Sequence, residues 1–162
     1  MSEIRYETID DAGEIDVAEV MAFYRRQGHR APSSPGRLRE MLRGSCCVVT
    51  ARDGERLVGF ARGVTDGVNG QLAECKLDQA FQGPGAVTRT AGRIEHDTSG
   101  IAREMASRVI DGMRARGVEM IHVLAYGTEV DFCEEMGFKR VGGMVALQME
   151  VESRVRETAP VG

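Results

Sequence analysis

A short stretch of small residues at the expected start of a helix could bind a phosphate group. It consists of Thr98, Ser99, Gly100, Ile101 and Ala102. Backbone N–H groups at a helix start lack internal partners and carry partial positive charge, so they attract anions. Gly100 would let a phosphate approach closely, and Arg103 could add a charged donor. Taken alone, the stretch is more typical of a Thr/Ser cap on an amphipathic helix, and the carboxylate of Asp97 beside it would repel a phosphate unless it turned away.

The histidines and cysteines do not indicate a metal site. His29, His96 and His122 lack metal-ligand spacing, so no metal is expected. His122 lies in an apolar run and is interpreted as a core histidine. Too few cysteines are present for a disulfide framework, and they are predicted to be buried, reduced thiols of a cytoplasmic protein. These cysteines are Cys46, Cys47, Cys75 and Cys133.

Composition is that of an ordinary globular protein. The chain has 162 residues, of which 42% are hydrophobic and 28% charged, and its formal net charge is −4. It is therefore long enough to bury the core of one domain. Arginines are scattered among acids, which disfavours a nucleic-acid partner. No basic start leads into an apolar run, and no run reaches the roughly 18 apolar residues of a membrane span, so neither a leader nor a membrane partner is expected.

In the first half of the chain, the periodicity predicts one strand, two helices and an antiparallel meander. The first helix has an apolar face and a left-handed stop at Gly28, and the second begins at Ser34-Pro35 and ends at Gly44. Glycine-containing turns separate the later strands. The predicted strands are Ile4–Ile9, Cys46–Ala51, Leu57–Val64 and Gln71–Asp78.

The second half predicts a parallel crossover and a closing pair of strands. Apolar residues at helical spacing run from Ile101 to Met113 before a stop at Gly117. A buried parallel strand, Met120–Leu124, a short helix capped by Thr128 and ended by Gly137, and two last strands, Phe138–Val141 and Met144–Glu150, follow. The fold class is therefore α+β. Residues 1–152 are predicted to form a single domain, with a polar tail over 153–162.

This order of elements, with four local stretches, resembles the GNAT superfamily of N-acetyltransferases. The resemblance implies a mixed, mostly antiparallel sheet of about seven strands flanked by about four helices. Pairing of two chains through the last strands, giving a homodimer, is also typical of such proteins. The four stretches are Leu57–Arg62 with Thr65–Gly67, Leu72–Gly83 (LAECKLDQAFQG), Ser99–Arg103, and Gly127–Phe138 (GTEVDFCEEMGF).

The resemblance implies that acetyl-CoA is the cosubstrate and that a primary amine of a small molecule or peptide attacks it directly. The pyrophosphate would lie on the helix start from Thr98 to Arg103. The pantetheine arm would lie along the backbone of Lys76, Leu77 and Asp78, and Phe132 would also contact the cosubstrate. A basic loop containing His29 would suit an acidic acceptor, or would simply be a solvated loop.

The same resemblance suggests how protons would move. Glu74 is the candidate general base, directly or through water, although an edge carboxylate in a surface ion pair is an alternative. Cys133 occupies the position of the usual general acid, a tyrosine, although packing of a small apolar residue is the simpler interpretation. Tyr126 could replace the missing tyrosine or be a structural aromatic.

Three departures from the usual pattern favour a rival interpretation. Residues 84–98 intervene between the fourth strand and the phosphate-binding helix, as a hairpin or a lid whose Arg89, Arg93 and His96 could reach the phosphates. Asp97 stands where Gln or Arg is usual, and Cys133 where tyrosine is usual. The rival is a degenerate GNAT-like domain that no longer transfers acyl groups and serves as a ligand-binding or protein-interaction module.

Overall fold

The structure, a computed structural model, describes residues 3–82 and 99–151. The predicted insertion over 84–98, including Asp97 and Thr98, and the tail over 153–162 lie outside these residues. The described chain is α+β, as the sequence predicts.

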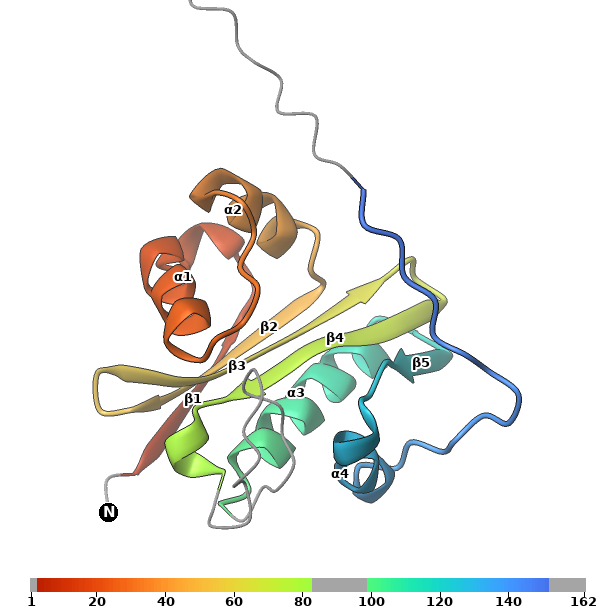
Figure 1. The fold of residues 1–162 in the computed structure, drawn as a ribbon. Helices are drawn as coiled ribbons and strands as arrows, with labels where there is room; N and C mark the ends of the chain where they lie inside the picture. Colours follow the sequence, from red (N-terminus) through yellow and green to blue (C-terminus); the bar gives the residue numbers. More distant parts are fainter. Residues whose placement is uncertain (1–2, 83–98, 152–162) are drawn as a thin grey trace, which may run out of the picture.

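A five-stranded sheet forms the centre of the described structure, with its strands in chain order from one edge to the other (Figure 1). The first four strands pair antiparallel, and β5 pairs parallel to β4, so the predicted meander and parallel crossover are confirmed. The strands are β1 (Ile4–Ile9), β2 (Cys47–Asp53), β3 (Arg56–Thr65), β4 (Asn69–Leu77) and β5 (Met120–Val123).

Helices cover both faces of the sheet. Helices α1 (Val17–Arg26) and α2 (Pro35–Arg43) lie on one face, and α3 (Ile101–Ala115) lies on the other (Figure 1). A short turn, η3 (Gly127–Glu129), leads into α4 (Val130–Glu135). The predicted cap of α2 is confirmed, because the Ser34 side chain accepts the Arg37 N–H.

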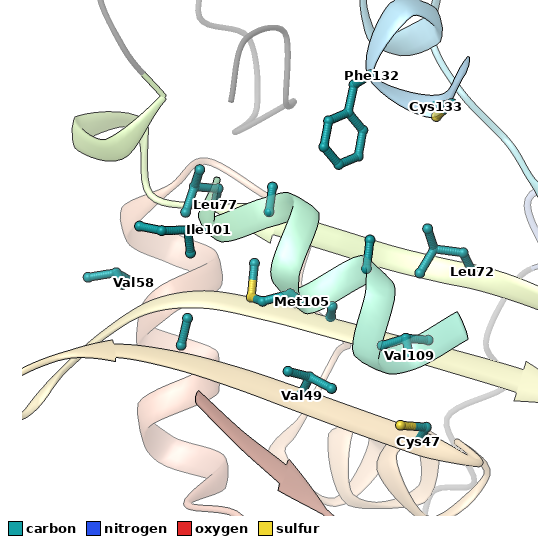
Figure 2. Close-up of a cluster of buried hydrophobic side chains, with 14 of the residues drawn as sticks. Cys47, Val49, Val58, Leu72, Leu77, Ile101, Met105, Val109, Phe132 and Cys133 are labelled. Atoms are coloured by element: carbon teal, nitrogen blue, oxygen red, sulfur yellow. The ribbon is translucent and has the colours of Figure 1, made fainter. Parts of the chain in front are cut away.

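Each face of the sheet has its own apolar core. On the α1 face, residues of α1 and α2 pack on Val48, Leu57 and Phe60. On the α3 face, the buried stripe of α3 packs on β2, β3 and β4 (Figure 2). Glycine lets α3 approach the sheet closely there, because a Cβ at Gly59 would lie 2.6 Å from the Met105 sulfur.

A bulge in β4 decides which face its side chains occupy. Arg62 pairs with Glu74 while Gly63 pairs with Leu72, so Ala73 is an extra residue in the ladder. Leu72 lies in the α3 core, and simple alternation would place Glu74 there as well. The extra residue shifts the alternation and turns Glu74 to the α1 face. There the Tyr24 hydroxyl of α1 donates a hydrogen bond to the Glu74 carboxylate.

The two predicted last strands are absent, which corrects the sequence prediction. Residues 138–151 follow α4 without pairing to any described strand. Their pattern has strand character, but a strand also needs a neighbour for its backbone groups. The large apolar side chains of this segment are exposed: Val141, Met144, Val145, Leu147, Met149 and Val151.

Two smaller predictions nearby are also wrong. Strand β5 is not buried on both faces, since Met120 is 55% exposed and His122 is exposed rather than a core residue. The cores under α1 and α2 involve β2 and β3, which leaves that face of β5 uncovered. Thr128 lies inside η3 instead of capping α4, whose N-cap position is Glu129.

Candidate functional site

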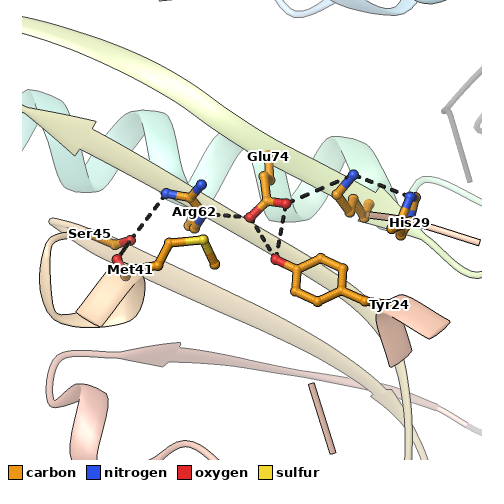
Figure 3. Close-up of polar contacts among 7 residues, drawn as sticks. Tyr24, His29, Met41, Ser45, Arg62 and Glu74 are labelled. Atoms are coloured by element: carbon orange, nitrogen blue, oxygen red, sulfur yellow. Dashed lines mark hydrogen bonds and ion pairs between the residues drawn. The ribbon is translucent and has the colours of Figure 1, made fainter. Parts of the chain in front are cut away.

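A half-buried carboxylate, Glu74, is the centre of a polar cluster on the α1 face of β4 (Figure 3). The Tyr24 hydroxyl donates to both carboxylate oxygens, at 3.0 and 2.8 Å. The Arg62 Nε donates to Oε2 at 2.5 Å, and both members of this ion pair have side chains 14% exposed. Glu74 therefore lies in a fixed orientation, because rigid donors from two elements hold it.

Lys76 and His29 extend the cluster along the strand. The Lys76 Nζ lies 3.9 Å from Glu74 Oε1 and 3.3 Å from His29 Nδ1. Burial lowers the pKa of Lys76, against the opposing effect of Glu74. His29 is buried, so this part of the loop is not the solvated segment that was the simpler interpretation.

Tyr24 is a firmly protonated hydrogen-bond donor. Burial, followed by the negative charge of Glu74, raises the pKa of Tyr24 well above its ordinary value near 10. Its ring lies edge-on to Phe60, with centroids 6.0 Å apart. The core on the α1 face thus fixes the ring that orients the carboxylate.

An open strand edge lies beside the first turn of α3. Strand β5 pairs with β4 only from Asn69 to Leu72, so residues 73–77 of β4 extend beyond it. The Cys75 thiol of that extension donates to the Ala102 carbonyl at 3.5 Å. The start of α3, where phosphate binding is predicted, is therefore adjacent to the stretch where pantetheine binding is predicted.

The start of α3 differs from the starts of α1 and α2. Side chains of Asp16 and Ser34 cap those helices, whereas the N-cap of α3 is Gly100, with φ +78° and no side-chain cap. Ser99 Oγ accepts the Ile101 N–H at a long 3.4 Å. A Cβ placed at Gly100 would meet no described atom within 4 Å, so a side chain at this position would point into space that the described residues leave open.

Other residues of the predicted cosubstrate site already have partners within the chain. The Leu77 carbonyl accepts Gln82 Nε2 at 2.8 Å, and the Asp78 N–H donates to the Val58 carbonyl at 2.7 Å. The Asp78 carboxylate forms an ion pair with Arg56. These contacts fix the end of β4.

Arg103, which was predicted to contact a phosphate, forms an exposed ion pair with Glu135. This contact connects the first turn of α3 to α4.

The two candidate acids occupy different environments. Cys133 lies with Phe132 in the α3 core, and burial raises the pKa of its thiol (Figure 2). That environment agrees with the packing role that was the alternative for Cys133. Tyr126 precedes η3, and its side chain is 59% exposed. Neither residue belongs to the cluster around Glu74.

Tyr24 and Arg62 are site residues that the sequence analysis missed. Arg62 faces Glu74 only because of the bulge in β4, since the unshifted register would have paired it with Ala73. Tyr24 lies on the buried, apolar face of α1, and nothing in the local sequence marks its hydroxyl as a partner for a residue on β4.

The described residues contain no cluster of three or more His, Cys, Asp or Glu side chains that could hold a metal ion. Across 3–82 and 99–151, no helix combines the length and apolar character needed to cross a membrane.

No protein-family model and no curated protein matches the chain, whereas 112 chains of known structure do. A GNAT-family acetyltransferase from Streptococcus pneumoniae has 17% identity and TM-score 0.64, over 91% of this chain and 100% of that one. An aminoglycoside acetyltransferase from an uncultured soil sample, in complex with sisomicin, has 12% identity and TM-score 0.64, over 92% and 97%. A Trypanosoma brucei acetyltransferase has 13% identity and TM-score 0.63, over 91% and 100%.

The chain therefore has the same fold as these acetyltransferases, one of which belongs to the GNAT family. Each of these neighbours covers nearly the whole chain at low identity, so the similarity concerns the fold. The activity has to be argued from the residues of the site.

Proposed function

We propose that this protein is an acetyl-CoA-dependent N-acetyltransferase that acetylates a primary amine of a small molecule or peptide by direct attack. The observation that carries the proposal is the contact between Cys75 and Ala102, which brings the open edge of β4 against the uncapped start of α3. The cosubstrate needs these two features side by side, because its extended pantetheine arm would lie along the strand edge and its pyrophosphate at the helix start. A GNAT-family acetyltransferase and an aminoglycoside acetyltransferase share this fold, which supports the assignment.

The described residues fit the anionic end of such a cosubstrate. Gly100 leaves space at the helix start, and its left-handed conformation suits a glycine. The N–H groups of the first turn would bind the pyrophosphate, as helix starts generally bind anions. Acetyl-CoA, when bound, supplies the acetyl thioester that the amine attacks.

On the acceptor side, Glu74 provides a negative charge that attracts an ammonium group and can accept its proton. Tyr24 and Arg62 hold the carboxylate in one orientation, which lowers the cost of positioning the amine. Deprotonation is required because only the neutral amine has a lone pair for attack. Glu74 would take the proton directly or through one water.

The proton for the leaving thiolate is better assigned to Tyr126 than to Cys133. Burial raises the pKa of the Cys133 thiol within an apolar core, where a charged product would be poorly solvated. The exposed Tyr126 side chain can exchange its proton with solvent. We therefore expect Cys133→Ala to retain most of its turnover and Tyr126→Phe to lose more.

Binding of the donor is tested by calorimetric titration with acetyl-CoA. Gly100→Val puts a branched side chain at the start of α3 and should abolish saturable binding. Gly117→Val is the matched control, because Gly117 has a similar φ of +82° at the other end of α3 and also faces open space. Equal binding by the two variants would remove the α3 start from the proposal.

Transfer is tested by following release of the CoA thiol with a panel of amines. Glu74→Gln keeps the shape of the side chain but removes its charge, and we expect turnover to fall by about 10²–10⁴-fold, the usual contribution of a general base. Glu19→Gln is the control, since Glu19 forms an ion pair with Arg52 away from this cluster. Unchanged turnover in Glu74→Gln would contradict the assigned role.

One observation favours the rival function, a non-catalytic binding module. Arg62 and Tyr24 already occupy the Glu74 carboxylate, which leaves fewer of its lone pairs for an acceptor amine. Saturable binding of acetyl-CoA with no thiol release for any amine in the panel would select this rival over the enzyme.

A further inference from the structure

Lysine is rare in this chain, yet a lysine lies in the candidate site. Lys76 and Lys139 are the only lysines among 21 lysine and arginine residues. Lys139 is exposed after α4, whereas the Lys76 side chain on β4 is only 24% exposed. For an ion pair alone arginine would serve at least as well, because it offers more donors and always stays charged. A lysine at position 76 provides what arginine cannot, a primary amine that can lose its proton.

The amine of Lys76 is loosely held beside a proton acceptor. Its Nζ lies 3.9 Å from Glu74 Oε1, whereas the Tyr24 hydroxyl and the Arg62 Nε bond the same carboxylate at 2.8 and 2.5 Å. On its other side, Nζ lies 3.3 Å from His29 Nδ1. The Glu74 carboxylate therefore keeps its orientation without Lys76, and the amine is close enough to pass it a proton through one water or a small movement.

Burial favours the neutral form of this amine. Desolvation lowers the pKa of Lys76, and the positive charge of Arg62 acts in the same direction. The negative charges of Glu74 and Glu129 oppose the shift without cancelling it. Lys76 therefore gives up its proton more readily than an exposed lysine does, and only the neutral amine has a lone pair for attack on a thioester.

Lys76 also lies on the part of β4 along which the donor is predicted to bind. Residues 73–77 extend beyond β5, and Cys75 of this stretch contacts Ala102 in the first turn of α3. A pantetheine arm bound along this edge would bring its acetyl group to a stretch that has a primary amine of its own.

We propose that Lys76 is a self-acetylation site, to which the chain transfers an acetyl group from acetyl-CoA. Self-acetylation rests on the proposed function, because it needs the same donor. The Lys76 ammonium first passes one proton to Glu74, directly or through water. The neutral nitrogen then bonds to the acetyl carbon, and the carbon–sulfur bond breaks with its electron pair leaving on the thiolate. The nitrogen loses its second proton to that thiolate, so the products are acetyl-lysine and the CoA thiol.

Peptide mass spectrometry after incubation with isotope-labelled acetyl-CoA tests the site. We expect the label to enter Lys76 about 10²-fold faster than Lys139, the lower end of what a positioned proton acceptor contributes. Lys76→Arg should abolish this labelling, and Lys139→Arg, the matched control, should leave it unchanged. Equal labelling of the two lysines in the wild type would overturn the proposal.

A short thioester separates directed transfer from ordinary lysine reactivity. S-acetyl-N-acetylcysteamine contains the acetyl thioester but no nucleotide, so the helix start cannot bind it through phosphates. Acetyl-CoA should label Lys76 much faster than this compound does at the same concentration. Similar rates with the two donors would mean that Lys76 is merely reactive, and would reject self-acetylation.

Protein concentration and the Glu74→Gln variant test whether the chain modifies itself. The fraction of Lys76 labelled per unit time should stay constant on dilution, whereas a proportional fall would show that one copy modifies another. Glu74→Gln should slow the labelling by at least about 10²-fold. Acetyl groups present before incubation are assigned to the chain only if Glu74→Gln protein from the same cells lacks them.

Calorimetric titration with acetyl-CoA distinguishes the two ways in which the idea can fail. Saturable binding and thiol release with an added amine, together with an unmodified Lys76, would reject self-acetylation alone. Absence of binding would reject the proposed function and self-acetylation with it. Binding by Glu74→Gln shows that this variant is folded, so slower labelling in it reports on the proton acceptor.

Discussion

The centre of the sheet and its β5 edge differ in how completely their side chains are covered. At β2 and β3, helices lie on both faces, and Val49, Val58 and Phe60 are fully buried. At β5, α3 covers one face only, the outer edge is open, and Met120 and Leu124 are exposed. A similar apolar pattern therefore gives a buried strand in one region and a half-exposed strand in the other. The difference teaches that burial depends on the covering layers and not on the strand sequence alone.

Ion pairs likewise differ in their exposure to water from one region of the molecule to another. The Arg62–Glu74 pair lies between β3, β4 and α1 with 14% of each side chain exposed, whereas the Arg103–Glu135 pair has 49 and 57% exposed. Ion pairs shielded from water are costly to break, while exposed ones contribute little. The polar cluster that defines the candidate site thus belongs to the well-covered region.

The largest contrast is expected for apolar truncation. Phe60→Ala should lower the free energy of unfolding by about 3–5 kcal/mol, because it leaves a cavity in a fully buried site. Leu124→Ala should change it by less than about 0.5 kcal/mol, since that side chain is mostly exposed. Urea denaturation measures both changes. Similar losses in the two variants would mean that the region around β5 is covered as well.

A second contrast compares ion pairs. Arg62→Met leaves the Glu74 charge without its guanidinium and should cost about 3 kcal/mol, the lower end for a broken buried pair. Arg103→Met should cost less than about 1 kcal/mol because its pair is exposed. Thermal unfolding at low and high salt would separate the effects of the two substitutions. Only the effect of Arg103→Met should vanish at high salt, because salt screens exposed charges.

Tyr24→Phe should cost about 1.5–3 kcal/mol, the usual value of a hydrogen bond to a charged group. It should also change how the free energy of unfolding depends on pH above about pH 10. The folded-state pKa of Tyr24 is raised, so the stabilisation is present below about pH 10, the unfolded value, and is lost as pH rises above it.

Lys76 contributes to the pH dependence of stability with the opposite sign. Its pKa is lowered, so stability rises with pH from its folded pKa to about 10.4. Chemical denaturation from pH 8 to 11 should therefore show a shallower decline above pH 10 in Tyr24→Phe than in the wild type. An identical decline would contradict the shift assigned to Tyr24.

The smallest contrast concerns helix caps. Ser34→Ala should destabilise by about 1 kcal/mol, because it removes the acceptor for the Arg37 N–H at the start of α2. Thr128→Ala should change the free energy of unfolding by less than about 0.5 kcal/mol, because Thr128 lies inside η3 and does not cap α4. A cost near 1 kcal/mol for Thr128→Ala would restore the cap predicted from the sequence. Differential scanning calorimetry resolves effects of this size.

What the sequence could predict was local. The faces of α1, α2 and α3 follow from the spacing of their apolar residues, since a helix repeats every 3.6 residues whatever its surroundings. Glycine stops were equally readable: Gly28, Gly117 and Gly137 all have positive φ, a conformation that other residues adopt at a cost. The antiparallel order of β2, β3 and β4 followed from the turns of two and three residues between them, because such short connections allow little else.

Only the tertiary structure decided the site and the chain end. The bulge at Ala73 turns Glu74 toward Tyr24, and no local pattern announces a bulge because it arises from pairing between two strands. The segment over 144–151 has the alternation of a strand in its sequence, yet it is unpaired in one chain. A strand is completed by its neighbour, so its sequence fixes only the tendency to pair, while the tertiary arrangement decides whether a neighbouring strand lies within reach.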